Sequence, residues 1–185
     1  MTFEMHFAFH KQRCKNRVFP PPSKKSHAVI RLIYSGSVAA EPDPQNLAAF
    51  LADCRRRNER DGISGVMVLM GQEFLQVIEG PDDDVDRYYR QVFQDTTRYK
   101  LLLLARQEID AAIFANWSLG LVKCEDTPND PLPGDVSIMD IEQIDPADLN
   151  ALRTLRVIRE FIDGKWHVRF PGPPKLSITQ RSRGF

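Results

Sequence analysis

The sequence predicts an α+β fold of the ferredoxin-like type: a five-stranded mixed sheet with two helices on one face, followed by a C-terminal helix. Two observations favour this fold. Strand-like and helical patterns follow one another between residues 28 and 122 in the order βαββαββ, a split βαβ sandwich with one added strand. A chain of 185 residues with 42% hydrophobic residues can also bury one ordinary core and still carry extensions.

The first ordered elements are a strand and a helix. In AVIRLIY the side chains alternate, so that Tyr34 shares one face with Ile30 and Leu32. The Asp-Pro pair at 43–44 supplies an N-cap followed by proline at the first helical position, which predicts a helix from there to about Asn58. Its inward positions at helical spacing are Leu47, Phe50, Leu51 and Cys54.

A β-hairpin and a second helix follow. GVMVLM and EFLQVIE have strand composition, and the Gly-Gln pair at 71–72 forms a two-residue turn with glycine first. The Gly-Pro pair at 80–81 ends the second strand. A helix is predicted from the acidic residues 82–84 to about Asp95, because negative charge is favourable at a helix N-terminus.

Two further strands and a C-terminal helix complete the prediction. KLLLLARQEI is apolar on both faces at its centre, which predicts a central place in the sheet, and WSLGLV at 117–122 predicts a short fifth strand. A helix is predicted over 146–163, ended by Gly164. Its apolar stripe, which we expect to cover the outer face of the sheet, consists of Leu149, Leu152, Leu155, Ile158 and Ile162. Its opposite side carries Arg153, Arg156 and Arg159.

The predicted domain organisation has a folded domain with extensions on both sides. It comprises a basic disordered extension (1–27), the folded domain (28–122), an acidic linker (123–145), a helical extension (146–170) and a disordered tail (171–185). Residues 121–150 carry one lysine and eight acidic residues, a net charge of −7 that is typical of a solvated linker. The whole chain has zero formal net charge, which argues against nucleic acid as its main partner.

Several classes of protein are disfavoured by what the sequence lacks. The longest apolar runs, such as residues 101–105, are far shorter than the roughly 20 residues that cross a bilayer, and no signal peptide is recognisable. The cysteines Cys14, Cys54 and Cys124 have no CxxC spacing, which favours the reducing cytoplasm. The four histidines show no ligand spacing, so no metal site is predicted.

Three uncharged polar residues are the candidates for a binding site. Asn58 and Gln76 are carboxamides in and around an otherwise apolar strand–turn–strand unit, where such groups are rare unless they hold something polar. Tyr34 ends the preceding apolar run. All three side chains can donate and accept hydrogen bonds without charge, which suits a flat, neutral, heteroaromatic ligand better than a metal or a phosphate.

Each candidate also has a purely structural explanation. Tyr34 alone fits a strand-end aromatic at the rim of the core, and Asn58 alone fits a helix C-cap because Gly62 is nearby. Trp117 fits a partly buried core residue. Gln76 is the hardest to explain structurally, since it lies within FLQVI.

Five segments follow one another over residues 28–122: RLIYSGS, RRNERDGISG, EFLQVIEGP, DTTRY and FANWSLG. In their order and spacing they together resemble the BLUF family of flavin-based blue-light sensors. LRVIREFIDGKWH is similar to the tail helix of short, single-domain members. The sequence departs from the family pattern at Arg57 (usually Asn or His), Ser64 (Thr), Tyr99 (His) and Leu119 (Met).

The resemblance implies roles for individual residues. Tyr34 matches the tyrosine that starts the photochemistry, and Gln76 matches the glutamine between that tyrosine and the flavin. Asn58 matches the asparagine that binds the pyrimidine edge of the ring, and Arg98 matches an arginine near the cofactor. Trp117 and Leu119, in the predicted fifth strand, are expected to relay the signal to the C-terminal helix.

The function that the resemblance implies is a cytoplasmic blue-light photoreceptor without enzymatic activity. It would bind flavin non-covalently, FAD being expected and FMN the alternative, and would signal to an unidentified partner protein when light rearranges the Tyr–Gln–flavin hydrogen bonds. Self-association is left open. The alternatives are a flavin-free interaction adaptor of the same fold, and a small enzyme such as a phosphatase, for which the sequence offers no nucleophile with a base partner and no phosphate loop.

Overall fold

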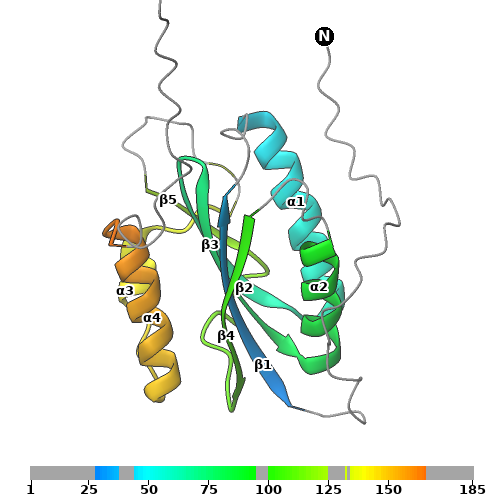
Figure 1. Cartoon of the computed structure of the whole chain (residues 1–185), viewed down its shortest axis with the longest axis vertical. Helices are drawn as coiled ribbons and strands as arrows, with labels where there is room; N and C mark the ends of the chain where they lie inside the picture. Colours follow the sequence, from blue (N-terminus) through cyan, green and yellow to red (C-terminus); the bar gives the residue numbers. More distant parts are fainter. Residues whose placement is uncertain (1–27, 38–43, 95–99, 125–131, 133, 166–185) are drawn as a thin grey trace, which may run out of the picture.

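The computed structural model describes residues 28–37, 44–94, 100–124, 132 and 134–165. One sheet lies at the centre, with helices α1 and α2 on one face and α3 and α4 on the other (Figure 1). The elements are β1 (Val29–Ser37), α1 (Pro44–Asp61), β2 (Ser64–Met70), β3 (Glu73–Pro81), α2 (Asp82–Gln94), β4 (Lys100–Ile109), β5 (Gly120–Lys123), α3 (Ile138–Glu142) and α4 (Leu149–Ile162).

The sheet has the strand order β4-β1-β3-β2-β5. All neighbouring strands are antiparallel except β2 and β5, which are parallel, so the sheet is mixed. The order βαββαββ and the α+β class are therefore confirmed. The predicted disorder of 1–27 and 171–185 and the predicted N-cap Asp43 lie outside the described residues.

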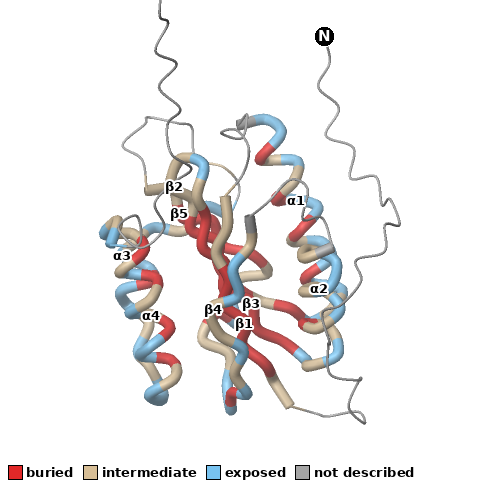
Figure 2. Tube along the Cα trace, in the orientation of Figure 1, coloured by how far each residue is buried: buried red, intermediate tan, exposed pale blue. Residues whose placement is uncertain are grey.

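Side-chain alternation along β1 and β3 divides the core into two sides. Ile30, Leu32 and Tyr34 pack on the side of α2, as the alternation of β1 predicts. Ile33 points to the other side and packs in a cluster that contains Ile158 of α4. The buried residues concentrate along the central strands between these two layers (Figure 2).

β4 is an edge strand, and the prediction of a central place for it was wrong. Among the described strands it pairs with β1 alone. Its apolar run has a different cause, because both of its faces are partly covered: Leu101 packs against the α2-side core and Leu104 against the α4-side core. Leu102 and Leu103 are exposed.

β5 begins at Gly120 rather than at Trp117. The backbone N–H and C=O groups of residues 117–118 do not form the regular hydrogen bonds of a strand pair. The Trp117 amide donates to the Phe114 carbonyl at 2.9 Å, which closes a turn. The Trp117 carbonyl accepts from Gly65 at 2.9 Å, and the Ser118 carbonyl accepts from the Asn58 side chain at 2.6 Å. Trp117 thus lies just outside the strand in which it was predicted.

α1 ends later than predicted, at Asp61, in a glycine cap. Gly62 has a φ of 64°, and the Ile63 amide donates to the Asn58 carbonyl at 2.8 Å, as in a Schellman motif. Asn58 therefore lies in the last turn of the helix. Of the predicted inward residues, Leu47, Leu51 and Cys54 are buried and Phe50 is half-buried.

The segment after β5 contains more structure than a linker. The short helix α3 lies inside the predicted linker 123–145 and begins with a capping box formed by Ser137 and Asp140. α4 begins at Leu149, with Asp148 as its N-cap, later than the predicted residue 146. No described helix has both the length and the apolar composition needed to cross a membrane.

α4 covers the sheet, as predicted, with a face that includes only part of the predicted stripe. Its buried residues are Ala151, Thr154, Ile158 and Phe161. Of the predicted stripe, Leu149 and Leu152 are 60% and 51% exposed. The predicted stripe was therefore right in part, since Ile158 is buried and Leu155 and Ile162 pack against the same core. Its N-terminal half was wrong, because a spacing of three residues drifts around a helix of 3.6 residues per turn, so that Leu149 and Ile158 are roughly 180° apart.

Candidate functional site

Tyr34 and Gln76 meet on the side of the sheet covered by α1 and α2. They face each other across the β1–β3 pair, and the Tyr34 hydroxyl donates to Gln76 Oε1 at 2.6 Å. Both side chains are at most 2% exposed. Two residues that the sequence singled out separately thus form one buried hydrogen bond.

Tyr88 of α2 completes this cluster, and the sequence analysis missed it. Gln76 Nε2 donates to the Tyr88 hydroxyl at 2.9 Å, and the hydroxyl oxygens of Tyr88 and Tyr34 are 3.3 Å apart. The signal was present in the sequence, because Val85, Tyr88, Tyr89 and Val92 have the spacing of one helix face. All four pack in the core on this side of the sheet.

Both phenols of the cluster hold their protons strongly. Burial, together with the nearby Tyr88, raises the pKa of Tyr34 well above its ordinary value. Burial also raises the pKa of Tyr88 to about 12. Near neutral pH each hydroxyl can therefore both donate and accept a hydrogen bond.

Cys54 lies one turn before Asn58 on α1. Burial raises the pKa of its thiol, although Arg57, whose Nη2 is 3.5 Å from Sγ, acts in the opposite direction. The thiol is therefore protonated near neutral pH. Like the two phenols, it adds no charge to this side of the sheet.

Asn58 lies on the same side of the sheet, but its side chain binds the segment before β5. It is 1% exposed, and its Nδ2 donates to the Ser118 carbonyl at 2.6 Å. The helix cap uses only the Asn58 backbone carbonyl, so capping does not account for this side chain. The structure brings Asn58 to the segment before β5 and gives it no hydrogen bond to Tyr34 or Gln76.

Trp117 and Leu119 lie on opposite sides of the sheet. Leu119 is buried in a cluster with Leu51 and Cys54 of α1. Trp117 stacks on Phe114, with ring centroids 5.7 Å apart, and packs against the core on the α4 side. The two residues predicted to relay a signal thus contact different helices.

The polar groups on the α1–α2 side suit an uncharged ligand. Tyr34, Gln76, Asn58 and Tyr88 come from four different elements and supply both donors and acceptors without formal charge, among apolar side chains. This chemistry fits a flat ring with carbonyl and N–H groups along its edge, such as a flavin. Arg98, the fourth predicted cofactor residue, lies outside the described residues, and the described residues contain no cluster suited to a metal ion.

Comparison with known proteins identifies a related family. Residues 29–120 match the family described as "BLUF: Sensors of blue-light using FAD". The blue light- and temperature-regulated antirepressor BluF of Escherichia coli K12 is 27% identical over 73 residues, which are 40% of this chain and 18% of that protein. The photoactivated adenylate cyclase subunit alpha of Euglena gracilis is 31% identical over 93 residues, 48% of this chain and 9% of that protein. The chain thus spans less than a fifth of the length of these curated relatives.

Solved structures show the same fold. The dark-state structure of the BLUF protein BlrB superposes with a TM-score of 0.52 at 25% identity, covering 71% of this chain and 96% of that one. Klebsiella pneumoniae BlrP1 with FMN and cyclic diGMP has a TM-score of 0.61 at 21% identity, covering 77% of this chain and 37% of that one.

Proposed function

Residues 29–120 of this chain form a BLUF domain, and from this premise we propose that the protein binds a flavin non-covalently and uses it to sense blue light without catalysing a reaction itself. Members of the family bind FAD or FMN. We propose FAD as the cofactor of this chain, held between α1 and α2 by Asn58 and Gln76. A protein partner is proposed to receive the signal.

The observation that carries this proposal is the buried 2.6 Å hydrogen bond from Tyr34 to Gln76. A bound flavin supplies light absorption and a strongly oxidising excited state. Tyr34 is a suitable donor, because its protonated phenol can release an electron and a proton together. The bond to Gln76 Oε1 would give that proton a path towards a bound flavin, which would accept the electron. When the electron and the proton return to Tyr34, the amide can be left rotated or tautomerised, since it both donates and accepts.

Tyr88 supports such a rearrangement in either direction. In the present orientation Gln76 accepts from Tyr34 and donates to Tyr88. If the amide turned over, its nitrogen would donate to Tyr34 and its oxygen would accept from Tyr88, because both hydroxyls can reverse their roles. One hydrogen bond contributes only about 0.5–1.5 kcal/mol net, so two orientations with equal numbers of bonds differ little in energy.

The test is an absorption spectrum of the purified protein before and after blue light. We expect a yellow protein whose flavin band shifts reversibly to longer wavelength. Tyr34→Phe and Gln76→Leu should retain flavin and lose the shift, because the donor or the relay is gone. A protein that stays colourless after reconstitution with FAD would contradict the proposal and favour a flavin-free adaptor.

A further inference from the structure

Arg55 of α1 connects three segments that are distant in the sequence. Its Nε donates to the Leu119 carbonyl at 2.8 Å, and its Nη2 donates to the Gly134 carbonyl at 3.3 Å. A guanidinium carries its N–H groups in a fixed planar fork, so it can hold two carbonyls at a defined separation. Arg55 therefore fixes the start of β5 and the loop at Gly134 to the same helix.

The backbone at Gly134 is fitted closely around this guanidinium. Gly134 has a φ of 81°, and a Cβ placed there would lie 2.5 Å from Arg55 Cζ, 2.6 Å from Nη2 and 2.8 Å from Nε. A residue with a side chain would be strained and would displace the arginine. The contact thus depends on glycine at this position.

Residues 134–136 are hydrogen-bonded to β5 and lie immediately before the C-terminal helices. The Leu121 amide donates to the Gly134 carbonyl at 3.2 Å, and the Val136 amide donates to the Leu121 carbonyl at 2.8 Å. Ser137, the next residue, is the N-cap of α3. A shift of residues 134–136 therefore changes the position at which α3 begins.

Asn58 and Arg55 lie one turn apart on α1 and hold adjacent carbonyls. Asn58 binds the Ser118 carbonyl and Arg55 binds the Leu119 carbonyl, just before β5 begins. Asn58 is also the α1 residue proposed above to contact the flavin. A rearrangement near Asn58 would thus displace residues 118–119, which Arg55 connects to the loop at Gly134.

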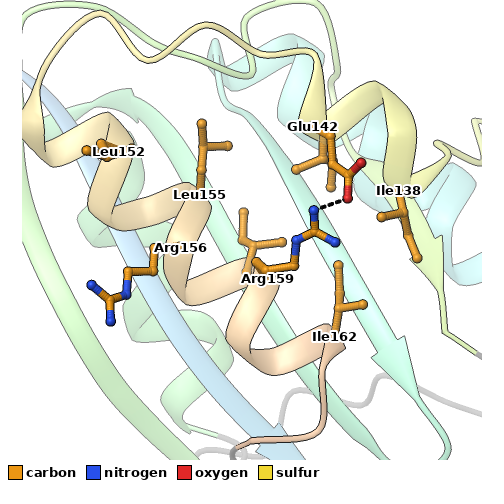
Figure 3. A pocket seen from close by; sticks show the side chains of 9 residues that line it. Ile138, Glu142, Leu152, Leu155, Arg156, Arg159 and Ile162 are labelled. Carbon is orange, nitrogen blue, oxygen red and sulfur yellow. Dashed lines mark ion pairs between the residues drawn. The ribbon is translucent and has the colours of Figure 1, made fainter.

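α3 and α4 contact each other beside an open hollow. A hollow of roughly 240 Å³ lies between them, lined mainly by apolar side chains and bridged by the ion pair of Arg159 with Glu142 (Figure 3). Ile141 of α3 and Ile158 of α4 are buried in one cluster, so a displacement of α3 would reach α4 through this close-packed contact. The ion pair is partly exposed and contributes little to fixing the helices.

We propose that Arg55 is a positioning residue that transmits a displacement of residues 118–119 to residues 134–136 and thereby to α3 and α4. This inference rests on the proposed light-sensing function and assigns a side chain to its output. Without Arg55, the flavin site would still respond to light. The C-terminal helices would follow the response less but not lose it, because the backbone bonds of Leu121 to Gly134 and Val136 would still join β5 to the loop before α3.

The test compares hydrogen exchange of residues 138–162 in the dark and under blue light, in the full chain loaded with FAD. The variants are Arg55→Gln and the matched control Arg56→Gln, which removes a neighbouring, 75% exposed arginine whose described partner is Asp53. An absorption spectrum of each sample reports the flavin response separately. We expect a red shift in all three proteins, and a light-induced change in exchange that is the same in the wild type and R56Q and is reduced in R55Q.

Each result has a distinct meaning. If R55Q shifts its spectrum and keeps the full light-induced change in exchange, the inference is wrong. If the wild type shows no red shift, the light-sensing function itself fails. If R55Q does not fold or does not bind FAD, the variant Gly134→Ala is used instead. Its added methyl group would push the Arg55 guanidinium away from the Gly134 carbonyl. A full light-induced change in G134A would overturn the inference, and its reduction would support it.

Discussion

A fully buried ion pair on the α4 side of the sheet offers the sharpest test of the packing. Arg31 of β1 and Glu79 of β3 face each other with no exposed side-chain surface, and Arg31 Nε is 2.6 Å from Glu79 Oε1. Glu79 Oε2 accepts from the Phe114 amide at 2.9 Å. Arg31 Nη1 donates to Thr154 Oγ1 of α4 at 3.3 Å, while the buried Nη2 has no hydrogen-bond partner among the described residues.

The perturbation is Arg31→Met. It leaves the Glu79 carboxylate in the core with the Phe114 amide as its donor in the described structure. Breaking a buried pair on one side costs about 3–5 kcal/mol, because the remaining charge has lost its partner. A domain of this size is stable by only about 5–15 kcal/mol, so the variant should lose between a fifth and all of its stability.

The double variant R31M/E79M tests the reason for that loss. Replacing a whole buried ion pair by apolar residues is often neutral or stabilising by about 1–4 kcal/mol. The Phe114 amide would lose its acceptor, which costs about 1–3 kcal/mol. The two contributions nearly cancel, so the double variant should be far more stable than R31M and close to the wild type.

Urea unfolding followed by circular dichroism measures these differences, provided that the slope with denaturant is unchanged. The control is Arg60→Met, which breaks the 2.7 Å ion pair between Arg60 and Asp61. The Arg60 side chain is 70% exposed. It should leave the midpoint unchanged, because exposed pairs contribute little. If R31M were as stable as the control, or if the double variant were as unstable as R31M, the reasoning would be refuted.

Three further predictions concern the site. Tyr88→Phe should lower stability by about 1–3 kcal/mol in urea unfolding, because Gln76 Nε2 loses its buried acceptor, and an unchanged midpoint would argue against this bond. Asn58→Ala should weaken FAD binding in a fluorescence titration more than Tyr34→Phe does, and equal affinities would contradict its proposed role. Burial raises the pKa of Tyr34 and raises that of Tyr88 to about 12, so the fold should keep its full stability below pH 10, the ordinary tyrosine value, and lose stability as the pH rises from there through the folded-state pKa values. Ultraviolet titration should show the tyrosinate of Tyr88 only near pH 12 and that of Tyr34 only well above pH 10, and ionisation of either near pH 10 would contradict their burial.

The central strands and the polar pair were predictable because local rules determine them. Strand alternation places Tyr34 on one face of β1, and an amide within an apolar strand indicated that Gln76 has a polar partner. Tyr88 was accessible to the same reasoning, since its helix face has a regular spacing. The family resemblance added the photochemical roles, which no spacing rule contains.

The errors arose where tertiary context overrides the local pattern. A strand covered on both faces can be central or at an edge, and the apolar run of β4 does not distinguish the two. The carbonyls before β5 are bound by side chains of α1, so Trp117 lies outside the ladder despite its strand-like neighbours. The sequence analysis assigned no place to Arg31, whose burial depends on the α4 side of the sheet being covered.

The parallel pairing of β5 with β2 has a consequence for the order of folding. β4 and β5 form opposite edges of the sheet, so residues 110–119 must cross its α4-side face, where the Phe114 amide is bound by Glu79. β5 can dock only after β1, β3 and β2 have been assembled by their antiparallel contacts. Late, sequence-distant contacts of this kind slow folding and often open first in native proteins. β5 and the two helices that follow it should therefore form the last part of this protein to fold and the first to unfold.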